Sequence, residues 1–224
     1  MKILTLDTAT EACSVSLGIG DRVIDRYLEL ERGHAEQLLP MVDAVLAEGG
    51  LTLRSLDAIA FGRGPGGFTG VRLAVSVAQG LAFGADLGLV PISDLAAVAQ
   101  RAAQLNPAAG RVLVVNDARM REVYWAAFEI QAGVISPAVE HVGAASTVEL
   151  PEGSSWVAAG RGLKAYPDLA ARCRERGVNV FPELLPRATE ILELARPAVA
   201  AGQILDPAVA LPVYVRDRVA EPSV

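Results

Sequence analysis

Cysteine and histidine are both scarce in this chain of 224 residues, which contains two of each. The two thiols, Cys13 and Cys173, do not make a disulfide framework, and we expect both to be reduced in a cytoplasmic protein. His34 and His141 each lack a second histidine or a cysteine at the spacing of metal ligands. The sequence therefore predicts no disulfide and no metal site.

Long apolar runs and an excess of positive charge are also missing. No run reaches the roughly 18 apolar residues that a membrane-spanning helix requires, so we expect no membrane segment. The start of the chain is too short and too soon acidic to be a signal peptide. The net charge is −6. Because phosphate contacts dominate the affinity for nucleic acids, we expect the chain alone to bind RNA weakly.

The sequence does contain a weak internal duplication. Residues 112–117 repeat the pattern of residues 3–7, in which an apolar strand ends in an acidic residue and turns into a second strand. A polar stretch rich in proline and glycine, near residue 107, separates the halves. Two such halves predict an α/β protein with the actin-like (ASKHA, ribonuclease-H-like) fold. Its two tandem sheet-centred subdomains are expected over residues 1–106 and 107–224, with the last segment free to return to the first.

Hydrophobic periodicity and turn residues predict the local elements. In the first half we expect an antiparallel meander over residues 3–30, then helices over 34–48, 71–84 and 94–104, with strands over 58–61 and 89–92. Ser93 should cap the third helix. In the second half we expect strands over 112–117, 123–130, 156–159 and 178–181, and helices over 163–176 and 188–201.

Residues 62–70, Gly-Arg-Gly-Pro-Gly-Gly-Phe-Thr-Gly, form a glycine-rich loop between a predicted strand and a predicted helix. We expect a type II turn over residues 64–67 with Gly66 at positive φ, and Thr69 as the helix cap. The loop also partly fits the dinucleotide fingerprint and the P-loop motif. However, Phe68 stands where a P-loop needs its lysine. A tight turn that packs the helix against the sheet is the favoured interpretation, and a nucleotide site is the alternative.

Acidic residues end both of the repeated strands, and in an actin-like fold such turns face a cleft between the subdomains. Carboxylates suit Mg²⁺, although each acid can equally cap its own turn. Ala9 stands where an actin-like ATPase usually carries a glycine that lets the backbone approach phosphate. We therefore expect a vestigial nucleotide cleft formed by Asp7, Thr8, Gly64, Gly66, Gly67 and Asp117.

The helices over residues 34–48 and 71–84 are apolar over more than half of their circumference, which is typical of helices buried on two sides. One side should pack on the chain's own sheet. We expect the other to accept a partner helix, while cover by the chain's own C-terminal helices is the alternative. The predicted partner interface consists of Leu38, Leu39, Val42, Val45, Leu46, Gly70, Ala74, Ala78 and Ala82.

Several segments together resemble the TsaB (YeaZ) family, and they occur in the same order along the whole chain. They are residues 7–15, 62–72, 79–82, 116–120 with 122–125, and 212–216. The resemblance implies an actin-like protein in the bacterial complex that makes threonylcarbamoyladenosine beside the tRNA anticodon. Members of this family resemble the catalytic subunit TsaD but lack its active site. The His-x-x-x-His metal pair of TsaD is absent here, because Leu38 follows His34 at that spacing.

The resemblance further implies a non-catalytic scaffold that acts by dimerising with TsaD, with the ATPase TsaE joining the complex. ATP then acts at the level of the complex, the chain needs no cofactor of its own, and tRNA is contacted only through the complex. In isolation the chain is a candidate homodimer. The alternative is an enzyme, either a glycoprotease-type peptidase or an actin-like ATPase.

Overall fold

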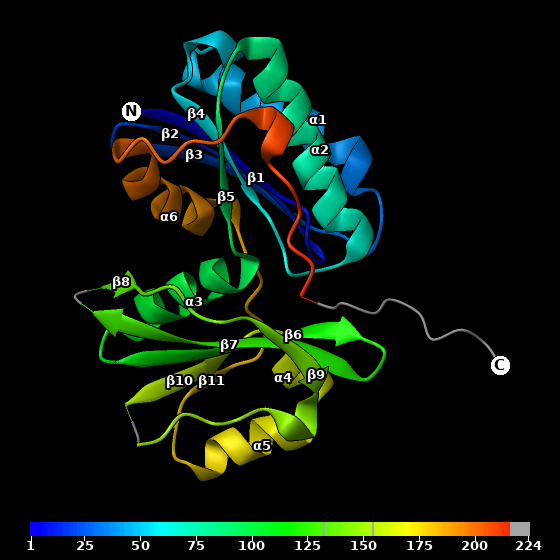
Figure 1. Cartoon of the computed structure of the whole chain (residues 1–224), viewed down its shortest axis with the longest axis vertical. Helices are drawn as coiled ribbons and strands as arrows, with labels where there is room; N and C mark the ends of the chain where they lie inside the picture. The colour runs from blue at the N-terminus through cyan, green and yellow to red at the C-terminus, as the bar shows by residue number, and fades with distance from the viewer. Residues whose placement is uncertain (132, 154, 216–224) are drawn as a thin grey trace, which may run out of the picture.

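The computed structural model describes residues 1–131, 133–153 and 155–215. The chain forms two lobes stacked along the long axis of the molecule, each built around a mixed β-sheet (Figure 1). We call them the first lobe and the second lobe in the order in which their sheets occur in the sequence.

The sheet of the first lobe has the strand order β3-β2-β1-β4-β5. Its first three strands, β1 (Lys2–Asp7), β2 (Ala12–Ile19) and β3 (Arg22–Glu29), form an antiparallel meander. This confirms the prediction for the N-terminus. β4 (Ala58–Gly62) and β5 (Leu89–Ile92) are added parallel to β1.

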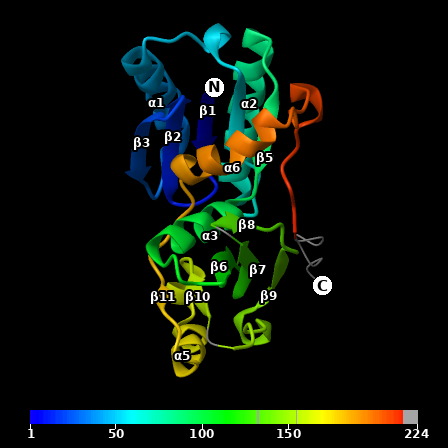
Figure 2. The same cartoon turned by 90° about the vertical axis from the view of Figure 1, so that its left-hand side faces the viewer.

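Helices cover both faces of this sheet. α1 (His34–Gly49) and α2 (Phe68–Ala85) pack on the face to which Leu4 and Leu6 point. α6 (Ala188–Ala200) packs on the opposite face, against Ile3 and Ala60, and lies in front of the sheet in Figure 2. Because side chains alternate between the two faces of a strand, the apolar run of β1 supplies both layers.

The sheet of the second lobe repeats this topology. β6 (Arg111–Arg119) and β7 (Glu122–Gln131) are antiparallel, and β10 (Trp156–Ala159) and β11 (Val180–Phe181) are parallel to β6. The short strands β8 (Val134–Ile135) and β9 (His141–Ala144) pair with the outer edge of β7. β6, β7, β10 and β11 thus correspond to β1, β2, β4 and β5, which confirms the predicted duplication and fold class.

Three helices accompany the second sheet: α3 (Asp94–Leu105), α4 (Gly162–Ala165) and α5 (Pro167–Glu175). α3 packs on β6 and also touches α6, so these two helices are the layers through which the lobes meet (Figure 2). Ser93 caps α3 as predicted, because its Oγ accepts a hydrogen bond from the N–H of Ala96. The subdomain boundary near residue 107 stays a prediction.

Two local predictions were wrong. The single helix expected over residues 163–176 is divided into α4 and α5 at Pro167, because a proline disfavours helical geometry in the residue before it, here Tyr166. α2 begins at Phe68, earlier than expected, and is 18 residues long. By length and composition alone it is apolar enough to cross a membrane, although Arg72 and Gln79 interrupt its apolar residues. Its inner face, however, packs in the core of the first lobe.

The C-terminal segment crosses back over the first lobe. Leu205 pairs with Leu89 at the free edge of β5, and the 3-10 turn η3 (Pro207–Val209) lies against α2. The Gln79 side chain of α2 donates hydrogen bonds of 2.9 Å to the carbonyls of Pro207 and Ala210. The segment over residues 212–215 then runs past the glycine loop, while Arg216, the last residue of the 212–216 stretch that resembles the family, lies outside the described residues.

Candidate functional site

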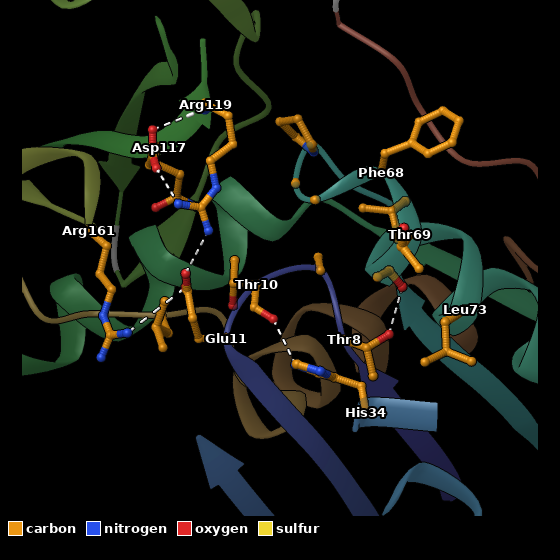
Figure 3. A pocket seen from close by; sticks show the side chains of 18 of the residues that line it. Thr8, Thr10, Glu11, His34, Phe68, Thr69, Leu73, Asp117, Arg119 and Arg161 are labelled. Atoms are coloured by element: carbon orange, nitrogen blue, oxygen red, sulfur yellow. Dashed lines mark hydrogen bonds and ion pairs between the residues drawn. The ribbon is translucent and has the colours of Figure 1, made fainter. Parts of the chain in front are cut away.

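A cavity of about 770 Å³ opens between the two lobes (Figure 3). Its walls come from the turn after β1, the first turns of α1 and α2, the end of β6 and the start of α4. Of the residues predicted to form the cleft, Thr8, Gly66, Gly67 and Asp117 line it. Asp7 and Gly64 do not, because both are buried beneath its wall. Their prediction as cleft residues is therefore corrected.

The glycine loop is folded differently from the expected type II turn. Gly64, and not Gly66, has positive φ (97°), and the peptide bond between Gly64 and Pro65 is cis. The cap residue of α2 is Gly67, so Thr69 lies inside the first turn instead of capping it. Thr69 lies inside the helix because α2 begins at Phe68, directly after the loop.

Hydrogen bonds within the protein engage key amides of this loop. The N–H of Gly64 donates to Asp94 Oδ2 at 2.5 Å, and the N–H of Gly67 donates to the carbonyl of Ala9 at 2.7 Å. A Cβ atom on Gly66 would lie 2.5 Å from that same carbonyl. The glycines therefore let the loop pack on the turn between β1 and β2. This supports tight packing as their role, because a phosphate cradle needs loop N–H groups directed at the ligand.

The two acids at the ends of the repeated strands cap their own turns. Asp7 Oδ1 accepts the N–H of Ala9 at 2.9 Å, and Asp117 Oδ1 accepts the N–H of Arg119 at 3.0 Å. The acceptor and donor are two residues apart in both cases, as in an Asx-turn. Within the described residues, no group of three or more His, Cys, Asp or Glu side chains is placed to hold a metal ion.

Ion pairs cross the cavity from one lobe to the other. Glu11, after β1, lies 3.2 Å from Arg119 and 3.9 Å from Arg161, measured between the charged atoms (Figure 3). Arg161 also pairs with Glu29 of β3, and its guanidinium holds the pKa of Glu29 below its usual value. Cationic side chains of the second lobe thus meet carboxylates of the first lobe, and of these carboxylates Glu11 lines the cavity.

Sequence patterns do not predict these cavity residues. Glu11 and Arg119 are separated by 108 positions, and no spacing rule connects residues so far apart. Asn116, which belongs to the stretch over residues 116–120 that resembles the family, is 3% exposed and lines the cavity, and its side-chain amide has no hydrogen-bond partner among the described residues. The turn after it carries three consecutive non-glycine residues at positive φ, which are Arg119, Met120 and Arg121.

An aromatic and arginine cluster stands at the other end of the cavity. The Arg72 guanidinium lies 3.5 Å from the centre of the Phe68 ring and donates a 2.7 Å hydrogen bond to the Tyr214 hydroxyl. Phe68 and Tyr214 are about half exposed. This cluster joins the outer face of α2 to the C-terminal segment.

Most of the predicted partner interface is core. Leu38, Val42 and Val45 of α1 are at most 1% exposed, and Leu46 is 8% exposed. The small residues Ala74, Ala78 and Ala82 of α2 are fully buried against the sheet. These residues cannot contact a partner in this conformation. The prediction was wrong because both the small and the large apolar residues pack against the chain's own sheet. Gly70 is half-buried against the turn at Thr8.

The outward residues of the same two helices are different ones. Leu39 of α1 is 48% exposed, and Phe83 near the end of α2 is 85% exposed. Leu73 and Val77 of α2 are half-buried and pack only at the edge of the core. Among the nine predicted interface residues, Leu39 alone is exposed.

Comparison with known proteins agrees with this architecture. Residues 28–222 match the family model described as TsaD: tRNA N6-adenosine threonylcarbamoyltransferase. The chain is 40% identical to the tRNA threonylcarbamoyladenosine biosynthesis protein TsaB of Escherichia coli K12, over 98% of this chain and 96% of that protein. A solved structure described as YeaZ from Pseudomonas aeruginosa is 43% identical, with a TM-score of 0.86 over 95% of this chain and 99% of that one.

A crystal structure of an uncharacterized protein with similarity to peptidase YEAZ, also from Pseudomonas aeruginosa, gives a TM-score of 0.88 at 43% identity. It covers 96% of this chain and 99% of that one. Sequence identity extends over nearly the whole length, and so does the agreement in fold. The chain belongs to the TsaB (YeaZ) family.

Proposed function

We propose that this chain is a non-catalytic subunit of the machinery that adds threonylcarbamoyl to N6 of the adenosine next to the tRNA anticodon. The role in tRNA threonylcarbamoyladenosine biosynthesis rests on its family. The chain would act by dimerising with TsaD, and TsaE would join the complex. ATP and tRNA would then be handled by the complex, in the cytoplasm, without a cofactor held by this chain.

The non-catalytic assignment is supported by the positions of the groups that would bind ATP in an actin-like ATPase. The amides of Gly64 and Gly67 are used inside the protein, and Asp7 is sealed from the cavity. An actin-like ATPase needs the corresponding groups free to reach phosphate and its metal ion. In this chain the cavity instead contains ion pairs between its own side chains, from Glu11 to Arg119 and Arg161.

The outer face of α1 and α2 is the proposed docking surface for TsaD. Leu39 is exposed there, and Leu73 and Val77 are half-buried, so a partner helix can cover them without disturbing the core. The Arg72 cluster extends this face toward the C-terminal segment, and arginine and tyrosine are enriched among interface residues that contribute most to binding.

The direct test is reconstitution with TsaD, TsaE, tRNA and the threonylcarbamoyl donor, with and without this chain. We expect threonylcarbamoyl transfer to tRNA to require both TsaD and this chain, and we expect the two proteins to copurify. Threonylcarbamoyl transfer by this chain in the absence of TsaD would contradict it. Robust ATP hydrolysis or peptide cleavage by the isolated chain would favour the enzyme alternative instead.

A further inference from the structure

Two fully buried carboxyl groups meet at the junction of the lobes. Asp7 ends β1 in the first lobe, and Asp94 is the first residue of α3, which packs on the second sheet. Both residues are 0% exposed, and their side chains lie within hydrogen-bonding reach of each other. Gly62 passes beside them so closely that a Cβ atom there would overlap both carboxylates.

The hydrogen bonds of the pair account for only half of its oxygen atoms. Asp7 Oδ1 accepts the N–H of Ala9, and Asp94 Oδ2 accepts the N–H of Gly64. The other oxygens, Asp7 Oδ2 and Asp94 Oδ1, have no donor among the described residues. A proton on one carboxyl group supplies the missing donor for the other, as in other closely spaced acid pairs.

The surrounding groups do not neutralise two negative charges. The positive charge of Arg63 lowers the pKa of Asp94, but the two terminal nitrogens of Arg63 bind Glu140 at 3.3 and 3.1 Å. His34, at the start of α1, affects the pKa of Asp7 only by an electrostatic effect, which lowers it. The Nε2 atom of His34 is 3.0 Å from the carbonyl oxygen of Thr10. The Cys13 thiol of β2 is neutral, since burial and then the charge of Asp7 raise its pKa to about 11.

We propose that Asp7 and Asp94 share one proton, which fastens β1 and the glycine loop to α3 and makes the junction of the lobes sensitive to pH. The carboxyl of Asp94 supports the loop through Gly64, and α2 begins directly after that loop. Loss of the proton would leave two like charges buried together. Separation of the loop from α3 relieves that repulsion, so the N-terminus of α2 is the element that moves with it.

The pKa directions agree with this arrangement. Burial raises the pKa of Asp7 to about 6. Burial also raises the pKa of Asp94 well above its usual range, and the charge of Asp7 raises it further. Near neutral pH the folded pair therefore holds a proton that the unfolded chain has released. Such a group makes the protein less stable as pH rises, by up to about tenfold in the folding equilibrium constant for each pH unit.

The experiment compares the wild-type chain with Asp94→Asn, using urea unfolding between pH 6.5 and 8.5. Asparagine keeps an acceptor for Gly64 and gives Asp7 a permanent donor. We expect the folding equilibrium constant of the wild type to fall with rising pH relative to that of the variant. The buried thiols of Cys13 and Cys173, whose pKa values are raised to about 11, lower the stability of both proteins alike toward pH 8.5, so the difference between the two slopes reports the shared proton. Asp117→Asn is the matched control, because Asp117 caps the same kind of turn but is not sealed in the core. It should keep the wild-type slope.

Carbon-13 NMR of the aspartate carboxyl groups provides the direct readout. At pH 7 the wild type should show an aspartate carboxyl signal in the protonated range, and that signal should be absent from Asp94→Asn. If Asp94→Asn does not fold, Asp7→Asn serves the same purpose. Equal pH slopes in wild type and variant, or aspartate carboxyl signals that are all ionised by pH 6, would overturn the proposal.

Discussion

The guanidinium of Arg63 donates two hydrogen bonds, of 3.1 and 3.3 Å, to the carboxylate of Glu140, and so joins the glycine loop of the first lobe to the second lobe. The Glu140 side chain is 9% exposed, and it also accepts a hydrogen bond from the Ser93 hydroxyl that caps α3. The glycine loop is therefore held at two points. The N–H of Gly64 donates a hydrogen bond to Asp94, and the Arg63 side chain binds Glu140. The loop acts as a joint between the lobes.

Removal of one partner from this pair should destabilise the protein clearly. Arg63→Ala leaves the Glu140 carboxylate buried without its cation, and a broken buried ion pair costs about 3–5 kcal/mol. Because Arg63 is 24% exposed, water can partly replace it, and we expect a loss of about 2–3 kcal/mol in the free energy of unfolding. Urea denaturation at pH 7 measures it.

The double variant Arg63→Ala with Glu140→Gln is the control for this prediction. It removes the buried charge together with its partner, so part of the lost stability should return. If the single and double variants are equally stable, the pair does not contribute through its charges.

The sequence was sufficient for most of the longer elements and their order, but not for the short strands β8 and β9 or for the division of residues 163–176 into α4 and α5. β4 is a continuous apolar run, β1 is apolar from Ile3 to Leu6 apart from Thr5, and proline and glycine mark the turns between elements, so local patterns predict these elements. The duplicated strand, acid and turn unit also led to the fold class. Such patterns depend on residues that are neighbours in the chain, which is why they can be read without a structure.

Pairing between distant residues could not be predicted in this way. Arg63 meets Glu140, and Asp7 meets Asp94, only because the lobes fold against each other. The faces of α1 and α2 were ambiguous for a related reason. An apolar arc shows that a helix is buried, but it does not show whether its own sheet or a partner covers each residue. Here the sheet covers Val42 and Ala78, and Leu39 faces outward.

Two glycines on the same helix should respond oppositely to substitution by alanine. A Cβ atom on Gly70 would overlap the carbonyl of Thr8, whereas a Cβ atom on Gly80 meets nothing within 4 Å. Gly70→Ala should therefore force α2 away from the turn after β1 and lower the free energy of unfolding by about 2 kcal/mol or more. Gly80→Ala should raise it by about 0.5–1 kcal/mol, because alanine favours a helix. Thermal unfolding of both variants checks the pair, and equal shifts would contradict the close packing described for the loop.

The ion pairs across the cavity should contribute little stability but respond to salt. Glu11 and Arg119 are 36% and 76% exposed at their side chains, and exposed pairs contribute about 0–1 kcal/mol. Glu11→Gln should therefore lower the free energy of unfolding by less than about 1 kcal/mol, and the difference should shrink as salt is added. Unfolding at low and high salt measures this. A large loss that salt does not change would show that Glu11 has a buried structural role instead.

The docking surface can be tested with two residues of α1 that lie three positions apart. Val42 is 1% exposed in the core, and Leu39 is 48% exposed on the outer face. Val42→Arg places an unpaired charge inside the core, which costs several kcal/mol, so the isolated chain should melt many degrees lower. Leu39→Arg leaves its charge in water, so the melting temperature should stay within a few degrees of wild type.

If TsaD covers this face, the Leu39→Arg substitution buries the charge in the complex, and copurification with TsaD should be lost. A Leu39→Arg variant that is stable and still copurifies fully would exclude this part of α1 from the interface. Loss of copurification without loss of stability would locate the partner on the outer face.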